Sequence, residues 1–138
     1  MGFLIILKTQ NTKINICAAN TGQNSIKFMS NPGDKTERIK LRAADREWNR
    51  LAFDHVDVPK VDTEGWEVEI LSCLGERLKD VDYVLVEYHS EQDRRTIDTL
   101  LTSHTLFGSH APQIGLGTMK YVRTALIDNV KICMEDVS

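Results

Sequence analysis

The sequence contains few cysteines and no large excess of charge of either sign. Its 138 residues include three cysteines, and 17 basic residues stand against 20 acidic ones. Three cysteines that are far apart and lack C-x-x-C spacing indicate neither a disulfide framework nor a zinc site. A net charge of −3, with the two signs mixed along the chain, provides no electrostatic surface for nucleic acid or anionic lipid. We therefore expect no nucleic-acid partner and no metal.

Long hydrophobic runs are also absent from the sequence. The apolar run near the amino terminus covers residues 2–7 and is too short to span a membrane. No small-residue cleavage pattern follows it, so it does not read as a secretion signal. We interpret this run as a core strand, and we expect a cytoplasmic protein with no membrane partner.

The length and the residue pattern predict one α/β domain. In the first third, residues 13–18 and 25–29 alternate polar and apolar side chains, which predicts two strands joined as a hairpin. Residues 31–35 carry the strongest loop signal of the chain, Asn-Pro-Gly-Asp-Lys, and residues 38–41 predict another short strand.

The remaining sequence alternates predicted helices and strands. In order, these are a helix over 45–52, a strand that begins at Pro59, a helix from Glu64 to Leu78, a strand over 81–89, a helix from Ser90 to about Ser103, a strand over 104–107, a loop over 108–117 and a strand over 119–127. The strand over 81–89 has a continuous apolar centre, which is typical of a strand buried on both faces. The pattern predicts a sheet that is parallel in its middle with an antiparallel terminal strand pair, in a domain over 1–127 followed by a polar tail over 128–138.

Two acidic residues, Asp62 and Glu64, directly follow the predicted strand that begins at Pro59. Ligands of open α/β sheets bind outside the carboxyl ends of the strands, so these carboxylates are placed to act as a base or a substrate contact. A structural role fits the spacing equally well: Asp62 would cap the following helix, and Glu64 would complement the helix dipole. The spacing alone leaves both interpretations open.

Glu87 and His89 end the strand over 81–89 and share one of its faces, because side chains of a strand alternate with a period of two. A glutamate that follows Val-Leu-Val lies close to the apolar interior, where burial raises the pKa of an unpaired carboxyl. A parallel neighbouring strand would place this exit beside Asp62 and Glu64. Carboxylates and an imidazole that converge there would suit proton transfer or the binding of a divalent metal. In the alternative interpretation, both side chains simply leave the sheet into water.

The other histidines and glycines carry weaker signals. His55, His104 and His110 stand in predicted loops or at the ends of elements, where surface or capping roles are expected. Gly115-Leu-Gly117 follows no clear strand and precedes no helix, so it predicts a turn and not a dinucleotide site.

Two segments together resemble the FkbM-type S-adenosylmethionine-dependent methyltransferases. Residues 60–67, Lys-Val-Asp-Thr-Glu-Gly-Trp-Glu, match the Lys-Ile-Asp-x-Glu-Gly-x-Glu signature of that family. Residues 84–89, Val-Leu-Val-Glu-Tyr-His, match the hydrophobic strand ending in glutamate that comes after the signature. Weaker similarity extends over residues 13–127. The resemblance implies a partial Rossmann-like, class I methyltransferase-like sheet.

The resemblance also implies a cofactor and a reaction. Asp62, Glu64, Glu87 and His89 would line the acceptor side, and Ala19 and Asn20 would lie by the adenine of S-adenosylmethionine. The implied reaction is methyl transfer to a hydroxyl of a small-molecule acceptor, a sugar or a secondary metabolite. The family's cofactor loop and ribose-binding acidic residue would precede residue 13, where twelve residues leave no room for them. The chain is therefore expected to correspond to the carboxyl-terminal part of such an enzyme, and to bind the cofactor poorly alone.

Two further interpretations follow from the same residues. The chain could be a non-catalytic Rossmann-like module or split subunit, which docks on a partner chain or a second copy of itself through an exposed sheet edge. It could also be a metal-binding domain that uses Asp62, Glu64 and His89.

Overall fold

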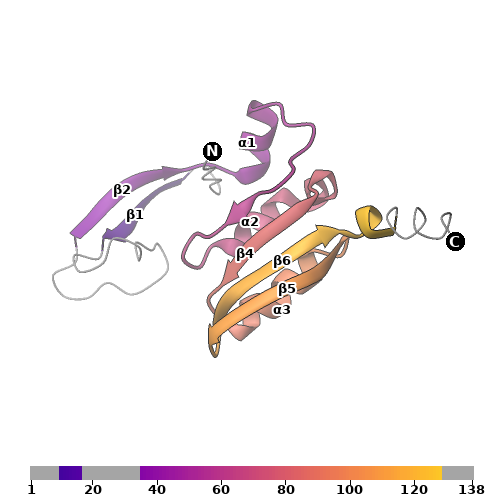
Figure 1. The fold of residues 1–138 in the computed structure, drawn as a ribbon. Helices are drawn as coiled ribbons and strands as arrows, with labels where there is room; N and C mark the ends of the chain where they lie inside the picture. The colour runs from indigo at the N-terminus through magenta and orange to yellow at the C-terminus, as the bar shows by residue number, and fades with distance from the viewer. Residues whose placement is uncertain (1–9, 17–34, 129–138) are drawn as a thin grey trace, which may run out of the picture.

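The computed structural model describes residues 10–16 and 35–128 of the chain (Figure 1). The elements are β1 (Gln10–Ile16), β2 (Lys35–Leu41), α1 (Ala44–Arg50), β3 (Lys60–Val61), α2 (Glu67–Leu74), the 3₁₀ helix η1 (Gly75–Asp80), β4 (Tyr83–Tyr88), α3 (Glu91–Leu100), β5 (His104–Gln113) and β6 (Leu116–Arg123). None of the helices in these ranges is long and apolar enough to cross a membrane.

The strands form two sheets. β1 and β2 pair antiparallel as a two-stranded sheet, and the other four strands form a mixed sheet in the order β3-β4-β6-β5. β3 and β4 are parallel, whereas β6 runs antiparallel to both β4 and β5. The predicted α/β class and the antiparallel terminal pair are confirmed. The parallel pair lies at one edge of the described sheet and not in its middle, because the last strand inserts between β4 and β5.

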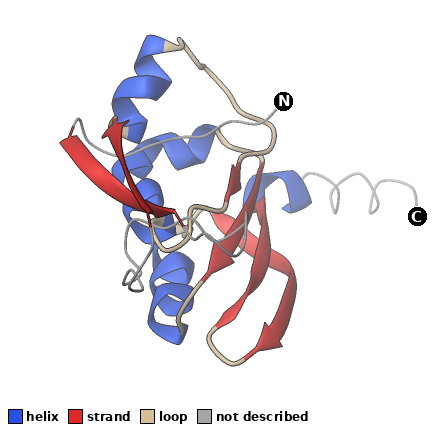
Figure 2. Cartoon of the chain, turned by 90° about the vertical axis from the view of Figure 1, so that its left-hand side faces the viewer, coloured by secondary structure: helices blue, strands red, loops and turns tan. Residues whose placement is uncertain are grey.

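α2 and α3 both cover the same face of the four-stranded sheet (Figure 2). The side chains between the helices and the strands are almost fully buried. They include Ile70, Leu71, Ile97, Val84, Val86, Met119 and Tyr121. Helix on sheet is a standard two-layer architecture that removes one face of the sheet from water.

The opposite face of the sheet is only partly covered in the described part of the chain. Burial alternates along β4, so that Val84 and Val86 are fully buried while Tyr83 is 40% exposed. Phe107 of β5 is 54% exposed and contacts the Tyr83 ring edge to face, at 6.2 Å between ring centroids. The prediction that this strand is buried on both faces is therefore wrong, because both helices pack on the same side.

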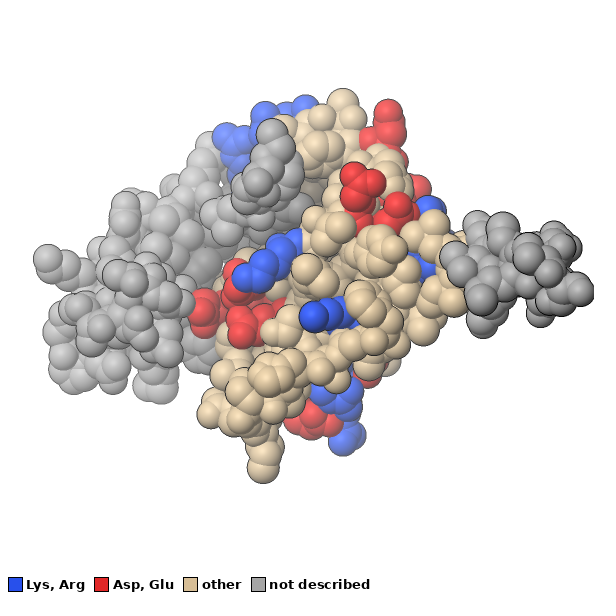
Figure 3. Space-filling view, viewed as in Figure 1, with Lys and Arg blue, Asp and Glu red and all other residues tan. Residues whose placement is uncertain are grey.

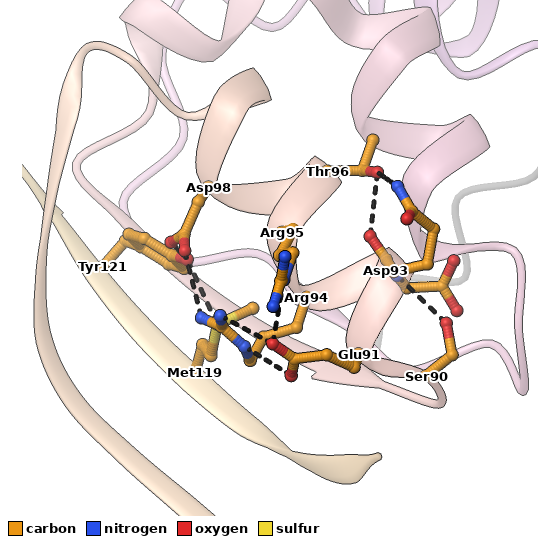
Figure 4. A network of polar contacts seen from close by, with 10 residues as sticks. Ser90, Glu91, Asp93, Arg94, Arg95, Thr96, Asp98, Met119 and Tyr121 are labelled. Atoms are coloured by element: carbon orange, nitrogen blue, oxygen red, sulfur yellow. Dashed lines mark hydrogen bonds and ion pairs between the residues drawn. The ribbon is translucent and has the colours of Figure 1, made fainter.

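Hydrogen bonds and ion pairs stabilise α3 at its start and along its length (Figure 4). The Ser90 hydroxyl accepts a hydrogen bond of 3.0 Å from the Asp93 amide and so caps the first turn of the helix. Arg94 forms ion pairs with Glu91 and Asp98, and Asp98 accepts a hydrogen bond from the Tyr121 hydroxyl of β6. This network ties the exposed side of the helix to the sheet beneath it.

The predicted loop over 108–117 is instead a hairpin. β5 extends to Gln113, a two-residue turn follows, and β6 begins at Leu116. Gly115 in that turn has φ +79°, a conformation that favours glycine. Pro112 is tolerated because β5 is an edge strand, where a missing amide hydrogen breaks no ladder bond on the outer side.

The end of the last predicted strand is also different. β6 ends at Arg123, and residues 124–128 are helical. The ladder to β4 begins at the pair Tyr83 and Val122, so residues beyond Arg123 have no strand partner on that side. The predicted polar tail lies almost entirely outside the described residues, and the domain boundary at 127 stays a prediction.

Predictions for the first third are tested only in part. β1 confirms a strand over most of 13–18, but its described partner is β2 and not residues 25–29, which lie outside the described residues together with 2–7. β2 confirms the strand over 38–41 and starts earlier, at Lys35.

The helix predicted over 45–52 is confirmed as α1, with Ala44 and Trp48 buried. It ends at Arg50, because Ala52 has a φ of +52° that a right-handed helix cannot continue through. Leu51, directly after the helix, is 42% exposed and does not belong to its buried side.

Candidate functional site

The loop between β3 and α2 forms one side of the candidate site. β3 begins at Lys60, one residue after the predicted start at Pro59, and the Pro59 carbonyl accepts a hydrogen bond of 3.1 Å from the Leu85 amide of β4. α2 begins at Glu67 and not at Glu64. Glu64 and Gly65 have φ values of +54° and +101°, which no right-handed helix accommodates. Glu64 therefore lies in the loop before the helix.

The structural role predicted for Asp62 is wrong. The residue before α2 is Trp66, and no side chain caps the helix from that position. Asp62 instead accepts a hydrogen bond of 2.6 Å from the Lys60 ammonium, because side chains two apart on an extended chain share a face.

Glu67 is a residue of the site that was not predicted from the sequence. Its carboxylate accepts hydrogen bonds from the Thr63 amide (2.8 Å), the Thr63 hydroxyl (3.1 Å) and the Gly65 amide (3.0 Å). The side chain is 1% exposed. The signal available in the sequence is the last glutamate of Asp-x-Glu-Gly-x-Glu, three residues after Glu64.

The parallel pairing of β3 and β4 brings the four predicted side chains together. Val61 is paired with Val86, so Asp62 lies beside Glu87, and their carboxyl groups form a hydrogen bond. His89 Nε2 lies 3.3 Å from Glu64 Oε2 and 3.9 Å from Glu87 Oε2. The His89 side chain is 10% exposed, and the three carboxylates are between 23% and 32% exposed. The site is thus a partly open cluster at the carboxyl ends of two strands.

Acidic side chains at this end of the strands reach the surface. Figure 3 shows one acidic patch toward the left of the described surface, where β3 and β4 end in the same view of Figure 1. A basic side chain lies directly beside this patch. The sheet face between the ends of the strands is mostly uncharged in that view.

The surroundings of the two adjoining carboxyl groups, Asp62 and Glu87, shift their pKa values in opposite directions. The Lys60 hydrogen bond lowers the pKa of Asp62 below its ordinary value. Burial, together with the hydrogen bond to Asp62 and the negative charge of Asp62, raises the pKa of Glu87 to about 7. Asp62 is therefore ionised at neutral pH while Glu87 exchanges its proton near neutrality. Two carboxyl groups whose environments move their pKa values apart are a common basis for acid–base chemistry.

The other histidines lie away from this cluster. His104 is buried, and its two ring nitrogens are hydrogen-bonded to the Val81 carbonyl and the Ser103 hydroxyl, both at 3.0 Å. The expected surface or capping role of His104 is therefore wrong. His55 and His110 are exposed. Ala19 and Asn20, which the family resemblance places by the cofactor, lie outside the described residues.

A metal-like arrangement occurs at the opposite end of β4. Within residues 42–128, the side chains whose ligand atoms all lie within 4.8 Å of one another are His55, Asp57 and Asp82. Asp82 also forms an ion pair of 2.7 Å with Arg123, which competes for the same carboxylate. The interpretation that Asp62, Glu64 and His89 bind a metal gains no support from this spacing.

Comparisons of the chain with protein-family models, with curated proteins and with solved structures found no match. The resemblance to FkbM-type methyltransferases therefore depends on residues 60–67 and 84–89 themselves.

Proposed function

We propose that the chain is an FkbM-like methyltransferase domain whose acceptor side is formed by Asp62, Glu64, Glu87 and His89. The observation that carries this proposal is the meeting of Asp62 and Glu87 at the carboxyl ends of two parallel strands, with the pKa of Glu87 raised to about 7. A carboxylate with a pKa near neutrality combines a useful ionised fraction with basicity, which general-base catalysis requires.

Each residue of the cluster has a distinct role in this proposal. Glu87, in its ionised form, accepts the proton that an acceptor hydroxyl loses. Asp62 stays ionised through its contact with Lys60, and its charge keeps Glu87 basic. His89 and Glu64, 3.3 Å apart, orient the acceptor by hydrogen bonds. An acceptor with several hydroxyls, such as a sugar or a secondary metabolite, suits a cluster of partly exposed carboxylates, which accept hydrogen bonds.

The cofactor that the resemblance implies, S-adenosylmethionine, supplies an electrophilic methyl group on a positively charged sulfur when bound. The described residues suit this positively charged group, because Asp62, Glu64 and Glu87 place carboxylates in one partly exposed cluster. Ala19 and Asn20 are the residues expected by its adenine. The proposed compartment is the cytoplasm.

Calorimetric titration of the purified chain with S-adenosylmethionine tests this proposal. We expect weak, saturable binding with a Kd on the order of 0.1–1 mM. Adenosine serves as the control ligand, because it lacks the charged sulfur and should bind more weakly. Absence of heat at millimolar S-adenosylmethionine would rule out independent methyltransferase activity for this chain.

A second candidate function is docking on a partner chain or on a second copy of the chain. In the described residues, β3 pairs with β4 on one side only, so its outer edge offers unpaired backbone groups. The same sheet carries the exposed Tyr83 and Phe107 on its partly covered face. Both features are typical of surfaces that bind another chain.

The mass of the chain in solution distinguishes docking between copies from an isolated domain. Light scattering during size exclusion should give twice the mass of a 15.7 kDa chain if copies pair. Replacing Phe107 with Asp places a charge on the apolar face and should return the mass to that of a monomer. A monomer at all concentrations would count against self-association.

A further inference from the structure

Glu67 joins the two halves of the candidate site through a single buried carboxylate. Its side chain is 1% exposed, and it stands at the first position of α2. The amino-terminal end of a helix favours a negative charge, so a carboxylate suits this position. Its partners lie in the loop before the helix and at the end of β4, which are distant in sequence.

The first half is the loop between β3 and α2. The amides of Thr63 and Gly65 both donate to the Glu67 carboxylate, and Glu64 lies between them. With φ at +54°, Glu64 is in a left-handed conformation that a residue with a Cβ rarely adopts. The two hydrogen bonds on either side of Glu64 hold this conformation in place. They thereby fix the direction in which the Glu64 side chain leaves the backbone.

The second half is the imidazole of His89. The Glu67 Oε2 atom lies 3.5 Å from His89 Nδ1, while Glu64 Oε2 lies 3.3 Å from His89 Nε2. The two glutamates therefore contact opposite nitrogens of the same ring. Glu67 touches the ring directly and controls the loop that presents Glu64. A carboxylate that only fixed the loop would need contacts with Thr63 and Gly65, and none with His89.

We propose that Glu67 is the positioning residue of this site, which holds the Thr63–Gly65 loop and the His89 ring as one unit. The role of this unit in methyl transfer rests on the proposed function. The contacts that form the unit do not depend on that function. Glu67 acts through Glu64 and His89 and reaches no acceptor itself, since its carboxylate is buried.

Glu67→Gln tests the proposal with a side chain of the same shape. Glutamine offers one acceptor oxygen and an NH₂ group, so it cannot accept from the loop amides and face His89 with a second acceptor atom. We expect Tm to fall by about 5–10 °C, because a buried network loses hydrogen bonds. We also expect the ring signals of His89 in two-bond ¹H–¹⁵N spectra to shift, with those of His55, His104 and His110 unchanged.

Two further variants make the measurement specific. His89→Gln identifies the His89 signals by their loss. Glu76→Gln is the matched control, because Glu76 is exposed in η1 and its ion pair within the described residues is with Lys79, so it should change neither Tm nor the ring signals. If Glu67→Gln does not fold, Thr63→Val removes one donor to the carboxylate and should shift the His89 signals in a folded protein.

The proposal is overturned if Tm falls in Glu67→Gln while the His89 signals stay in place, because Glu67 would then fix the loop before α2 only. Unchanged His89 signals in a folded Thr63→Val protein would overturn it equally. Neither measurement uses S-adenosylmethionine. A failed cofactor titration would therefore remove the proposed function and leave this result standing.

Discussion

Replacing Gly117 with alanine is expected to lower the free energy of unfolding by about 3 kcal/mol, because the added methyl group has no space. A Cβ at this position would lie 2.4 Å from the His110 carbonyl oxygen and 2.6 Å from the Tyr88 hydroxyl. The carbonyl belongs to the backbone of β5, so it cannot rotate away as a flexible side chain could. The strands would have to separate or the Tyr88 ring would have to leave its buried position.

Gly108 provides the matched control for this prediction. It lies in the same hairpin, but a Cβ there would meet the Lys120 side chain at 3.6 Å, an ordinary contact distance. Gly108→Ala should therefore change the unfolding free energy by less than about 1 kcal/mol. Urea unfolding of the two variants measures the difference. Equal effects of the two substitutions would contradict the prediction, because they would show that β5 and Tyr88 leave room for a methyl group at Gly117.

The position of Gly117 also connects the hairpin to the candidate site. Gly117 is paired with Tyr88, and His89 is the next residue along the chain. A displaced Tyr88 ring would move the end of β4 and with it the imidazole between Glu64 and Glu67. The hairpin that the sequence analysis interpreted as a loop thus helps to fix the site.

The convergence of Asp62 and Glu87 could be predicted from the sequence, because it follows from two local rules. Asp62 directly follows β3 and Glu87 lies near the end of β4, and parallel strands bring their carboxyl ends to the same edge. His89 follows Glu87 by two residues, so it comes to the same place. The parallel pairing of β3 with β4 is the one long-range contact that had to be assumed to predict this cluster.

The role of Glu67 could not be predicted in the same way. A glutamate at the start of a helix is usually interpreted as a residue that complements the helix dipole, and a fully exposed side chain can have that role. Its burial depends on the left-handed conformation of Glu64, which turns the Thr63 and Gly65 amides toward the helix. The same carboxylate lies 3.5 Å from His89 Nδ1 at the end of β4, a contact between distant segments that no local pattern encodes.

The hairpin of β5 and β6 was missed for a different reason. Glycine and proline at 108, 112, 115 and 117 are the residues that local rules assign to loops. Here Pro112 lies on an edge strand and Gly117 lies where a neighbouring backbone approaches closely, and both are special positions within a sheet. The strand order that creates these positions is a property of the whole sheet.

Glu87→Gln is expected to make the protein's stability less dependent on pH between pH 5 and 8. The pKa of Glu87 rises from its ordinary 4.5 to about 7 on folding, mainly through burial. The folded state thus binds this proton more tightly than the unfolded state does. The resulting stabilisation is complete below pH 4.5 and is lost as the pH rises toward 7. The full effect would be about 3 kcal/mol, and partial exposure of the side chain reduces it to about 1–2 kcal/mol.

Urea unfolding of wild type and variant at pH 5 and at pH 8 measures this difference. Relative to wild type, Glu87→Gln should gain about 1–2 kcal/mol between the two pH values, because the amide has no proton to lose. Asp62 titrates below this range, because its pKa is lowered. Glu91→Gln is the control, since Arg94 holds the pKa of Glu91 at about 2 and its effect should be the same at both pH values. An equal difference for Glu87→Gln at pH 5 and pH 8 would mean that Glu87 is already ionised at pH 5. The carboxyl at the end of β4 would then lack the basicity on which proton transfer from an acceptor hydroxyl depends.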